Sequence, residues 1–118
     1  MANGLHVLII EDEMLIGMDV FHCLEGCGFE TFAFAGTEIQ ALEQARLRRP
    51  DLVTVDVRLL SGDGLTAAGS LAREHGALPV IYVTGDPGAL KGRPDAVVVE
   101  KPFIAEDFAA ACRRLRLH

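Results

Sequence analysis

Short apolar segments alternate with amphipathic segments along the whole chain, and this alternation constrains the fold more than any other feature of the sequence. The apolar segments are rich in aliphatic and β-branched residues and predict strands at 5–10, 30–35, 52–57, 78–84 and 96–100. Segments with helical spacing separate them and predict helices at 13–25, from Thr37 to just before Pro50, at 65–75 and at 104–115. Strands that alternate with helices form βαβ units, and such units build a parallel sheet.

The same alternation predicts the order of the strands, because right-handed crossovers leave few topologies. We expect an α/β fold: a flavodoxin-like doubly wound five-stranded parallel sheet of order 2-1-3-4-5, with helices on both faces. The sequence contains no internal repeat and no interdomain linker, so residues 1–118 are predicted to form a single domain. The segments "RLLSGDG" (58–64) and "GDPGALKGRPD" (85–95) are predicted to be loops.

Polar side chains stand where the predicted strands end. In a doubly wound sheet the ligand site lies beyond the carboxyl ends of the strands, at the switch point between the first and third strands. The polar residues at or just beyond these strand ends are Glu11, Asp12, Asp56, Thr84 and Lys101. Any one of them alone has a structural explanation, such as an acid that favours a helix dipole or a solvated lysine. Their convergence on one edge from distant segments favours a functional site.

Three of these residues are carboxylates, which would raise one another's pKa unless a cation neutralised them. A hard divalent ion with oxygen ligands fits this set, and magnesium is the predicted cofactor because it binds a few carboxylates together with waters and phosphate oxygens. The neighbouring acid Glu13 is assigned to the first turn of the following helix and is left outside the site.

The overall charge argues against some kinds of partner. The chain has 11 Lys and Arg against 17 Asp and Glu, a formal net charge of −6, so neither nucleic acid nor an anionic membrane is an expected partner. The N-terminal residues "MANGLHV" do not resemble a signal peptide, and no apolar run is long enough to span a bilayer. Three cysteines without metal-binding spacing are expected to be small core residues, Cys23, Cys27 and Cys112. A cytoplasmic location is therefore predicted.

Four stretches of the chain resemble the receiver domain of two-component response regulators: "LIIEDE", "VTVDVRL", "VIYVTGD" and "VVVEKPF". The resemblance extends over essentially the whole chain. It implies that Asp56 is the phosphoryl acceptor, that Asp12 is a direct magnesium ligand, and that Glu11 acts mainly through a metal-bound water. The backbone carbonyl of Arg58 would complete the protein's share of the metal coordination.

The resemblance also implies roles for the residues at the ends of the fourth and fifth strands. Thr84 would be the switch hydroxyl that moves to the phosphoryl group. Lys101 would pair with Asp56 at rest and with a phosphoryl oxygen afterwards, and the Lys101-Pro102 bond would be cis. Arg58 and Asp86, each two residues beyond a key position, would tune how fast water removes the phosphoryl group.

The sequence departs from the family pattern at two places. Val98 stands where many receivers have an aromatic residue on the fifth strand, so the usual coupling between a threonine and an aromatic ring is not expected here. Residues 85–95 have poor helix propensity where the family has its fourth helix, as in a variant group of receivers familiar in alphaproteobacteria. We predict that this segment is loop-like or poorly ordered before phosphorylation and becomes ordered on activation.

The resemblance implies a signalling switch and not an enzyme. The only reactions that it would catalyse are its own phosphorylation and dephosphorylation. A sensor histidine kinase or a histidine phosphotransfer protein would supply the phosphoryl group, and residues 85–116 would contact a downstream protein. The sequence does not decide whether the protein forms a homodimer or whether the chain is part of a longer regulator. One alternative is a magnesium-dependent phosphatase with an aspartyl nucleophile, although Arg58 stands where that chemistry needs an acid. The other is a degenerate receiver that acts only as a docking module.

Overall fold

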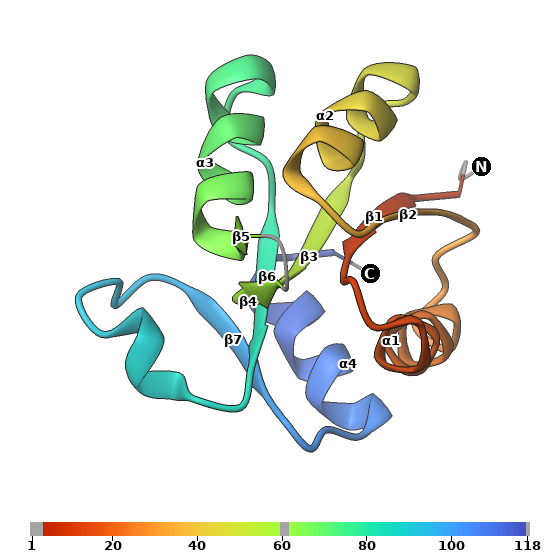
Figure 1. Ribbon diagram of the computed structural model, residues 1–118. Coiled ribbons are helices and arrows are strands. Elements are labelled where there is room, and N and C mark those ends of the chain that lie inside the picture. The colour runs from red at the N-terminus through yellow and green to blue at the C-terminus, as the bar shows by residue number, and fades with distance from the viewer. Residues whose placement is uncertain (1–3, 60–61, 118) are drawn as a thin grey trace.

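The computed structural model describes residues 4–59 and 62–117 of the chain. Five parallel strands form its central sheet in the order β2-β1-β3-β6-β7 (Figure 1). Their bounds are β1 (His6–Ile10), β2 (Thr31–Ala35), β3 (Leu52–Asp56), β6 (Val80–Thr84) and β7 (Val97–Glu100). Counted by these five strands alone, this is the predicted doubly wound order 2-1-3-4-5.

Among the described residues, four α-helices cover the two faces of this sheet, as predicted. Helices α1 (Met14–Glu25) and α4 (Ala105–Arg114) lie on one face, and α2 (Glu38–Leu47) and α3 (Gly64–His75) lie on the other (Figure 1). Each sheet face therefore has its own hydrophobic core.

The two cores follow from the alternation of side chains along the central strand β1. Val7 and Ile9 face α1 and α4, where the ring of Phe108 is completely buried. Leu8 and Ile10 face the other way, against small residues of α2 and α3. Because β1 is buried on both faces, its sequence "HVLII" is a continuous apolar run after His6.

Side-chain caps fix the starts of two helices next to the site. The Thr37 hydroxyl accepts a hydrogen bond from the Gln40 backbone N–H (3.1 Å), as an N-cap threonine does. The Gln40 side chain, however, accepts from Gly36 N–H (2.8 Å) and not from Thr37. At α3, the Asp63 carboxylate accepts from Leu65 N–H at 2.7 Å.

The predicted loop 58–64 was wrong in part. Residues Arg58–Leu59 (β4) and Gly62–Asp63 (β5) form a short antiparallel pair, and Gly64 is already the first residue of α3. Residues 60–61, between β4 and β5 in the sequence, lie outside the described residues. The other boundaries moved by at most two residues, as at β6, where the predicted strand 78–84 begins only at Val80, after Pro79.

The segment 85–95 has a single turn of 3-10 helix, η1 (Pro87–Leu90), and no α-helix. This agrees with the loop-like conformation predicted from its Gly and Pro content. Figure 1 shows this segment extending away from the body of the sheet beside β7.

The three cysteines are free thiols that pack in or against the α1/α4 core. Cys112 is buried, whereas Cys23 and Cys27 are only half-buried, and Cys27 lies just beyond the end of α1. Among the described residues, no helix is long and apolar enough to cross a membrane.

Candidate functional site

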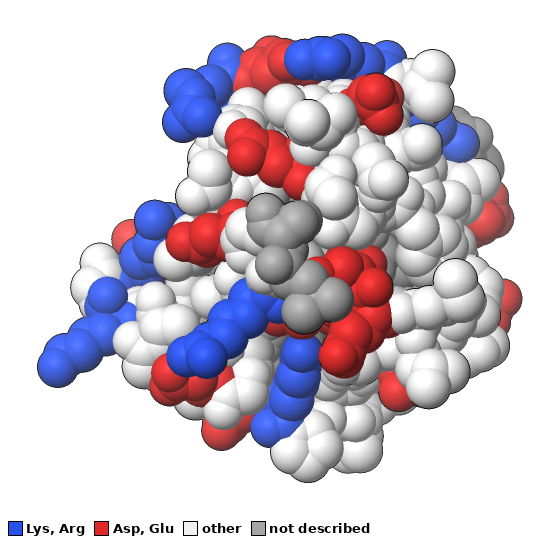
Figure 2. All heavy atoms as spheres, in the orientation of Figure 1, with Lys and Arg blue, Asp and Glu red and all other residues white. Residues whose placement is uncertain are grey.

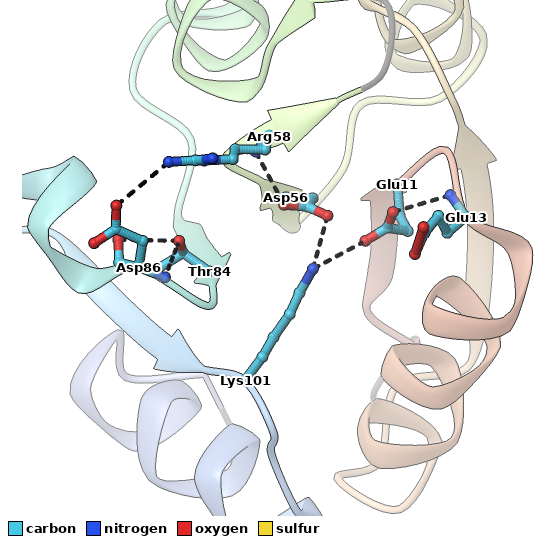
Figure 3. Close-up of polar contacts among 7 residues, drawn as sticks. All are labelled: Glu11, Glu13, Asp56, Arg58, Thr84, Asp86 and Lys101. Carbon is cyan, nitrogen blue, oxygen red and sulfur yellow. Dashed lines mark hydrogen bonds and ion pairs between the residues drawn. The ribbon is translucent and has the colours of Figure 1, made fainter.

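The register of the parallel strands places the predicted site residues on one edge of the sheet. Ile10 is paired with Val55, so Glu11 follows β1 at the level where Asp56 ends β3. Thr84 ends β6 and is paired with Glu100, the residue before Lys101. Figure 3 shows the resulting group of side chains around Asp56.

Asp56 is the central acid of this group and is buried, with 7% of its surface exposed. One carboxylate oxygen, Oδ1, accepts a hydrogen bond from the Arg58 backbone N–H at 3.0 Å. The other, Oδ2, accepts from the Lys101 ammonium at 2.9 Å. Each oxygen of this buried carboxylate thus has a donor, and its charge is offset by the lysine.

Glu11 lies on the other side of Lys101. Its Oε1 is 4.0 Å from the lysine Nζ, and its Oε2 accepts a hydrogen bond from the Glu13 backbone N–H at 3.0 Å (Figure 3). The side chain is 3% exposed, and this burial, followed by the neighbouring Asp56 carboxyl, raises the pKa of Glu11 to about 8. The charged form of Glu11 is therefore disfavoured beside Asp56 when no further cation is present.

A pocket of about 370 Å³ opens beside Asp56, lined by Asp12, Glu13, Asp56, Arg58, Thr84, Gly85, Asp86 and Lys101. Figure 2 shows acidic side chains in the middle of this face, with Lys and Arg side chains beside them. Glu13 thus borders the site from which sequence reasoning had excluded it. It is also the N-cap residue of α1 and not part of its first turn.

Thr84 is buried, and its hydroxyl is engaged with the turn that follows β6. The oxygen Oγ1 accepts from the Asp86 backbone N–H (3.0 Å) and donates to the Asp86 carbonyl (3.1 Å). Arg58 reaches the same turn, with its guanidinium 3.4 Å from Asp86 Oδ2 (Figure 3). The two residues predicted to tune dephosphorylation therefore face each other at the mouth of the pocket.

The donor set suits magnesium by its chemistry, since carboxylate and carbonyl oxygens are the ligands this ion prefers. The raised pKa of Glu11 shows that burial and the adjacent Asp56 disfavour its charged form, which a bound divalent cation would favour. Over residues 4–59 and 62–117, however, no three acidic, His or Cys side chains already converge as a metal site. Lys101 lies between Glu11 and Asp56, so an ion would bind after these side chains rearrange.

Gly64 is a site residue that sequence reasoning missed. A Cβ built on it would lie 2.0 Å from the backbone carbonyl oxygen of Asp56, so α3 begins in close contact with the strand end that carries this aspartate. The Gly64 N–H also donates to the Val57 carbonyl at 2.9 Å. In the sequence, the stretch Gly62-Asp63-Gly64 gives only a turn signal.

Comparisons with known proteins agree with this geometry. The family model described as "Response regulator receiver domain" matches residues 7–112. The transcriptional regulatory protein PdtaR of Mycobacterium tuberculosis is 42% identical over 78 residues, which is 66% of this chain and 38% of that protein. The phyllosphere-induced regulator PhyR of Methylorubrum extorquens is 39% identical over 102 residues, which is 82% of this chain and 38% of that protein.

Solved structures give the same result. The solution structure of the PhyR REC domain of Erythrobacter litoralis has a TM-score of 0.86 at 31% identity and covers 97% of this chain and 92% of that one. The receiver domain of NtrX from Brucella abortus has a TM-score of 0.82 at 30% identity, with 95% and 99% of the two chains covered. The chain spans only 38% of the length of the curated relatives PdtaR and PhyR.

Proposed function

The chain belongs to the response regulator receiver family, and from this premise we propose that it is a phosphorylation-dependent switch of a two-component system. Asp56 would accept a phosphoryl group from a sensor histidine kinase or a histidine phosphotransfer protein. The observation that carries this proposal is the contact between Asp56 Oδ2 and Lys101 Nζ in a pocket open to solvent. A buried carboxylate with an adjacent ammonium is suited to receive a charged group.

The transfer step needs a nucleophile and a counter-charge. An oxygen of the Asp56 carboxylate forms a bond to phosphorus while the bond between phosphorus and the donor imidazole nitrogen breaks, and the electron pair stays on the imidazole. Lys101 lies where it can exchange the Asp56 carboxylate for an oxygen of the arriving phosphoryl group. Thr84 lines the same pocket, and its hydroxyl is the second donor proposed to turn toward the phosphoryl oxygens.

Magnesium is the proposed cofactor, held by Asp12, Asp56, the Arg58 backbone carbonyl and, through water, Glu11. When bound, it would neutralise charge on the transferring phosphoryl oxygens. Lys101 alone is shared between two carboxyl groups, which supports the need for a second cation.

An exposed apolar surface next to the site supports docking of the phosphodonor protein. Met14 and Leu15, at the start of α1, are 81% and 82% exposed, and Phe34 of β2 is also exposed. Met14 and Phe34 line a groove that includes Glu11 and Asp12, so the surface is continuous with the phosphorylation pocket. A protein bound there would lie beside Asp56.

The output is proposed to be a protein contact through residues 85–116 in the cytoplasm, and a homodimer is an open alternative. Since relatives such as PdtaR are named transcriptional regulatory proteins, a partner in gene regulation is a reasonable target. The phosphatase alternative is disfavoured, because Arg58 takes the place of the second acid that such chemistry needs. The docking-module alternative would leave the contact between Asp56 and Lys101 unexplained.

Beryllofluoride, which mimics a phosphoryl group on aspartate, tests the proposal. Its addition with magnesium should shift the amide signals of Asp56 and Thr84 in the wild type, and Asp56→Asn should abolish the shift. A wild type that does not respond would favour the docking-module alternative.

A further inference from the structure

The hydroxyl of Thr84 has a single proton, and this proton is donated to the Asp86 carbonyl oxygen at 3.1 Å. The same hydroxyl also accepts from the Asp86 N–H at 3.0 Å, so the side chain is closed into a small ring with the turn that follows β6 (Figure 3). A donation to a phosphoryl oxygen and a donation to Asp86 exclude each other. Binding of Thr84 to a phosphoryl group therefore has to break a bond to Asp86.

Asp86 also begins the 3-10 turn η1. Its carbonyl oxygen, which receives the Thr84 proton, accepts a second hydrogen bond from the Ala89 N–H at 3.0 Å. Its side-chain Oδ1 accepts from the Gly88 N–H at 3.1 Å and so caps the turn. The state of the Thr84 hydroxyl and the start of η1 thus depend on the same residue.

The ion pair of Asp86 with Arg58 stabilises the turn after β6 less than the side-chain cap on Gly88 N–H does. The two groups are 3.4 Å apart, and their side chains are 79% and 57% exposed, so solvent screens their attraction. The cap, by contrast, fixes the backbone of residues 86–88 directly. Loss of the cap, and not loss of the charge, should therefore release Thr84.

We propose that Asp86 is a positioning residue whose side chain holds the turn that keeps the Thr84 hydroxyl away from the phosphorylation site at rest. The inference rests on the proposed function, in which Thr84 moves to the phosphoryl group. When it moves, the Asp86 carbonyl loses one of its two donors, and η1 is freed to change conformation. In this chain the coupling of Thr84 to Asp86 takes the place of the usual coupling of the threonine to an aromatic residue on the last strand. The corresponding position of β7 is Val98, which is paired with Tyr82.

Three variants of the full chain separate the cap from the charge. Asp86→Ala removes both, Asp86→Asn keeps an oxygen that can cap and removes only the charge, and Asp95→Ala removes an exposed acid of the same segment. Two quantities are measured: the three-bond couplings of the Thr84 methyl group, which report its rotamer without any phosphoryl mimic, and the affinity for beryllofluoride with magnesium.

Asp86→Ala should average the Thr84 couplings and tighten beryllofluoride binding about fivefold, because the resting conformation loses its cap. Asp86→Asn and Asp95→Ala should keep wild-type couplings, and Asp95→Ala should also keep the wild-type affinity. Wild-type couplings in Asp86→Ala, or averaged couplings in Asp86→Asn, would overturn the proposal. Failure of the wild type to bind beryllofluoride would instead count against the proposed function, while the couplings would still decide the role of Asp86.

Discussion

The Nζ atom of Lys101 lies 2.9 Å from Oδ2 of Asp56 and 4.0 Å from Oε1 of Glu11, so one ammonium group lies between two enclosed carboxyl groups. This arrangement joins the ends of β1 and β3 to the loop after β7. It also means that the lysine is the counter-charge for two acids before any metal or phosphoryl group arrives. Several properties of the site should depend on this single side chain.

Replacement of the lysine tests its part in phosphoryl transfer. Lys101→Met removes the ammonium and should slow phosphorylation of Asp56 by acetyl phosphate at least ~10-fold. The oxygens of the transferring phosphoryl group then lose a positively charged hydrogen-bond donor. Lys91→Met, which changes the other lysine of the chain, is the matched control and should react at the wild-type rate. A Lys101→Met protein that reacts as fast as the wild type would exclude this role.

Two glycines of α3 form a natural pair for a stability test. Gly64→Ala places a Cβ 2.0 Å from the Asp56 carbonyl oxygen and should lower the free energy of unfolding by ~1–3 kcal/mol. Gly69→Ala meets only the end of the Arg73 side chain, at 3.5 Å, and should raise it by ~0.5–1 kcal/mol through helix propensity. Urea denaturation measures both; equal effects of the two changes would contradict the packing described at Asp56.

His6 lies at the end of the sheet opposite the candidate site, and it should make the free energy of unfolding depend on pH. Burial, followed by Arg48, lowers the pKa of this imidazole below its usual 6.5, although Asp51 and Thr31 oppose the change. The unfolded chain then takes up a proton near pH 6.5 while the folded chain resists it. The stability from His6 is complete above pH 6.5 and is lost as the pH falls from there through the lower folded-state pKa.

The His6→Gln variant isolates this effect. Its free energy of unfolding should fall less than that of the wild type between pH 7 and pH 5, since the variant has no imidazole to titrate. Parallel curves for the two proteins would show that His6 takes up its proton equally well in the folded and unfolded states.

Residues 85–95 should respond to phosphorylation as a segment. The segment has one 3-10 turn at Pro87–Leu90 and no α-helix, and its amides donate only to groups within short local turns, such as Ala89 to Asp86, so they should exchange quickly at rest. With beryllofluoride and magnesium, protection of residues 86–93 should increase. Strong and equal protection in both states, measured by hydrogen exchange, would contradict the prediction that activation orders this segment.

The sequence was sufficient to predict the fold, because β1 and β3 are buried on both faces and therefore appear as nearly continuous apolar runs. It also located Asp56 and Lys101 at one edge, since parallel strands end on the same side. It did not predict the contact of Gly64 with Asp56, because a glycine in a turn and a glycine pressed against a backbone look alike in sequence. The β4–β5 pair was missed for a similar reason: strands of two residues have too few positions to show a period.

The positions of Glu13 and Thr84 needed coordinates as well. An acid before a helix is either its N-cap or part of its first turn, and a shift of one residue in the helix start decides which. The structure shows that Glu13 is the N-cap. The engagement of the Thr84 hydroxyl with Asp86 depends on a side-chain rotamer, which no spacing of residues encodes.

The central claim is that Asp56 accepts a phosphoryl group, and the mass of the intact protein tests it most directly. After incubation with acetyl phosphate and magnesium, the wild type should gain the mass of one phosphoryl group, and chelation of the metal should prevent the gain. Asp56→Asn should gain none, while Asp51→Asn, at the opposite end of β3, should behave as the wild type. A gain in Asp56→Asn equal to that of the wild type, or no gain in the wild type, would contradict the account.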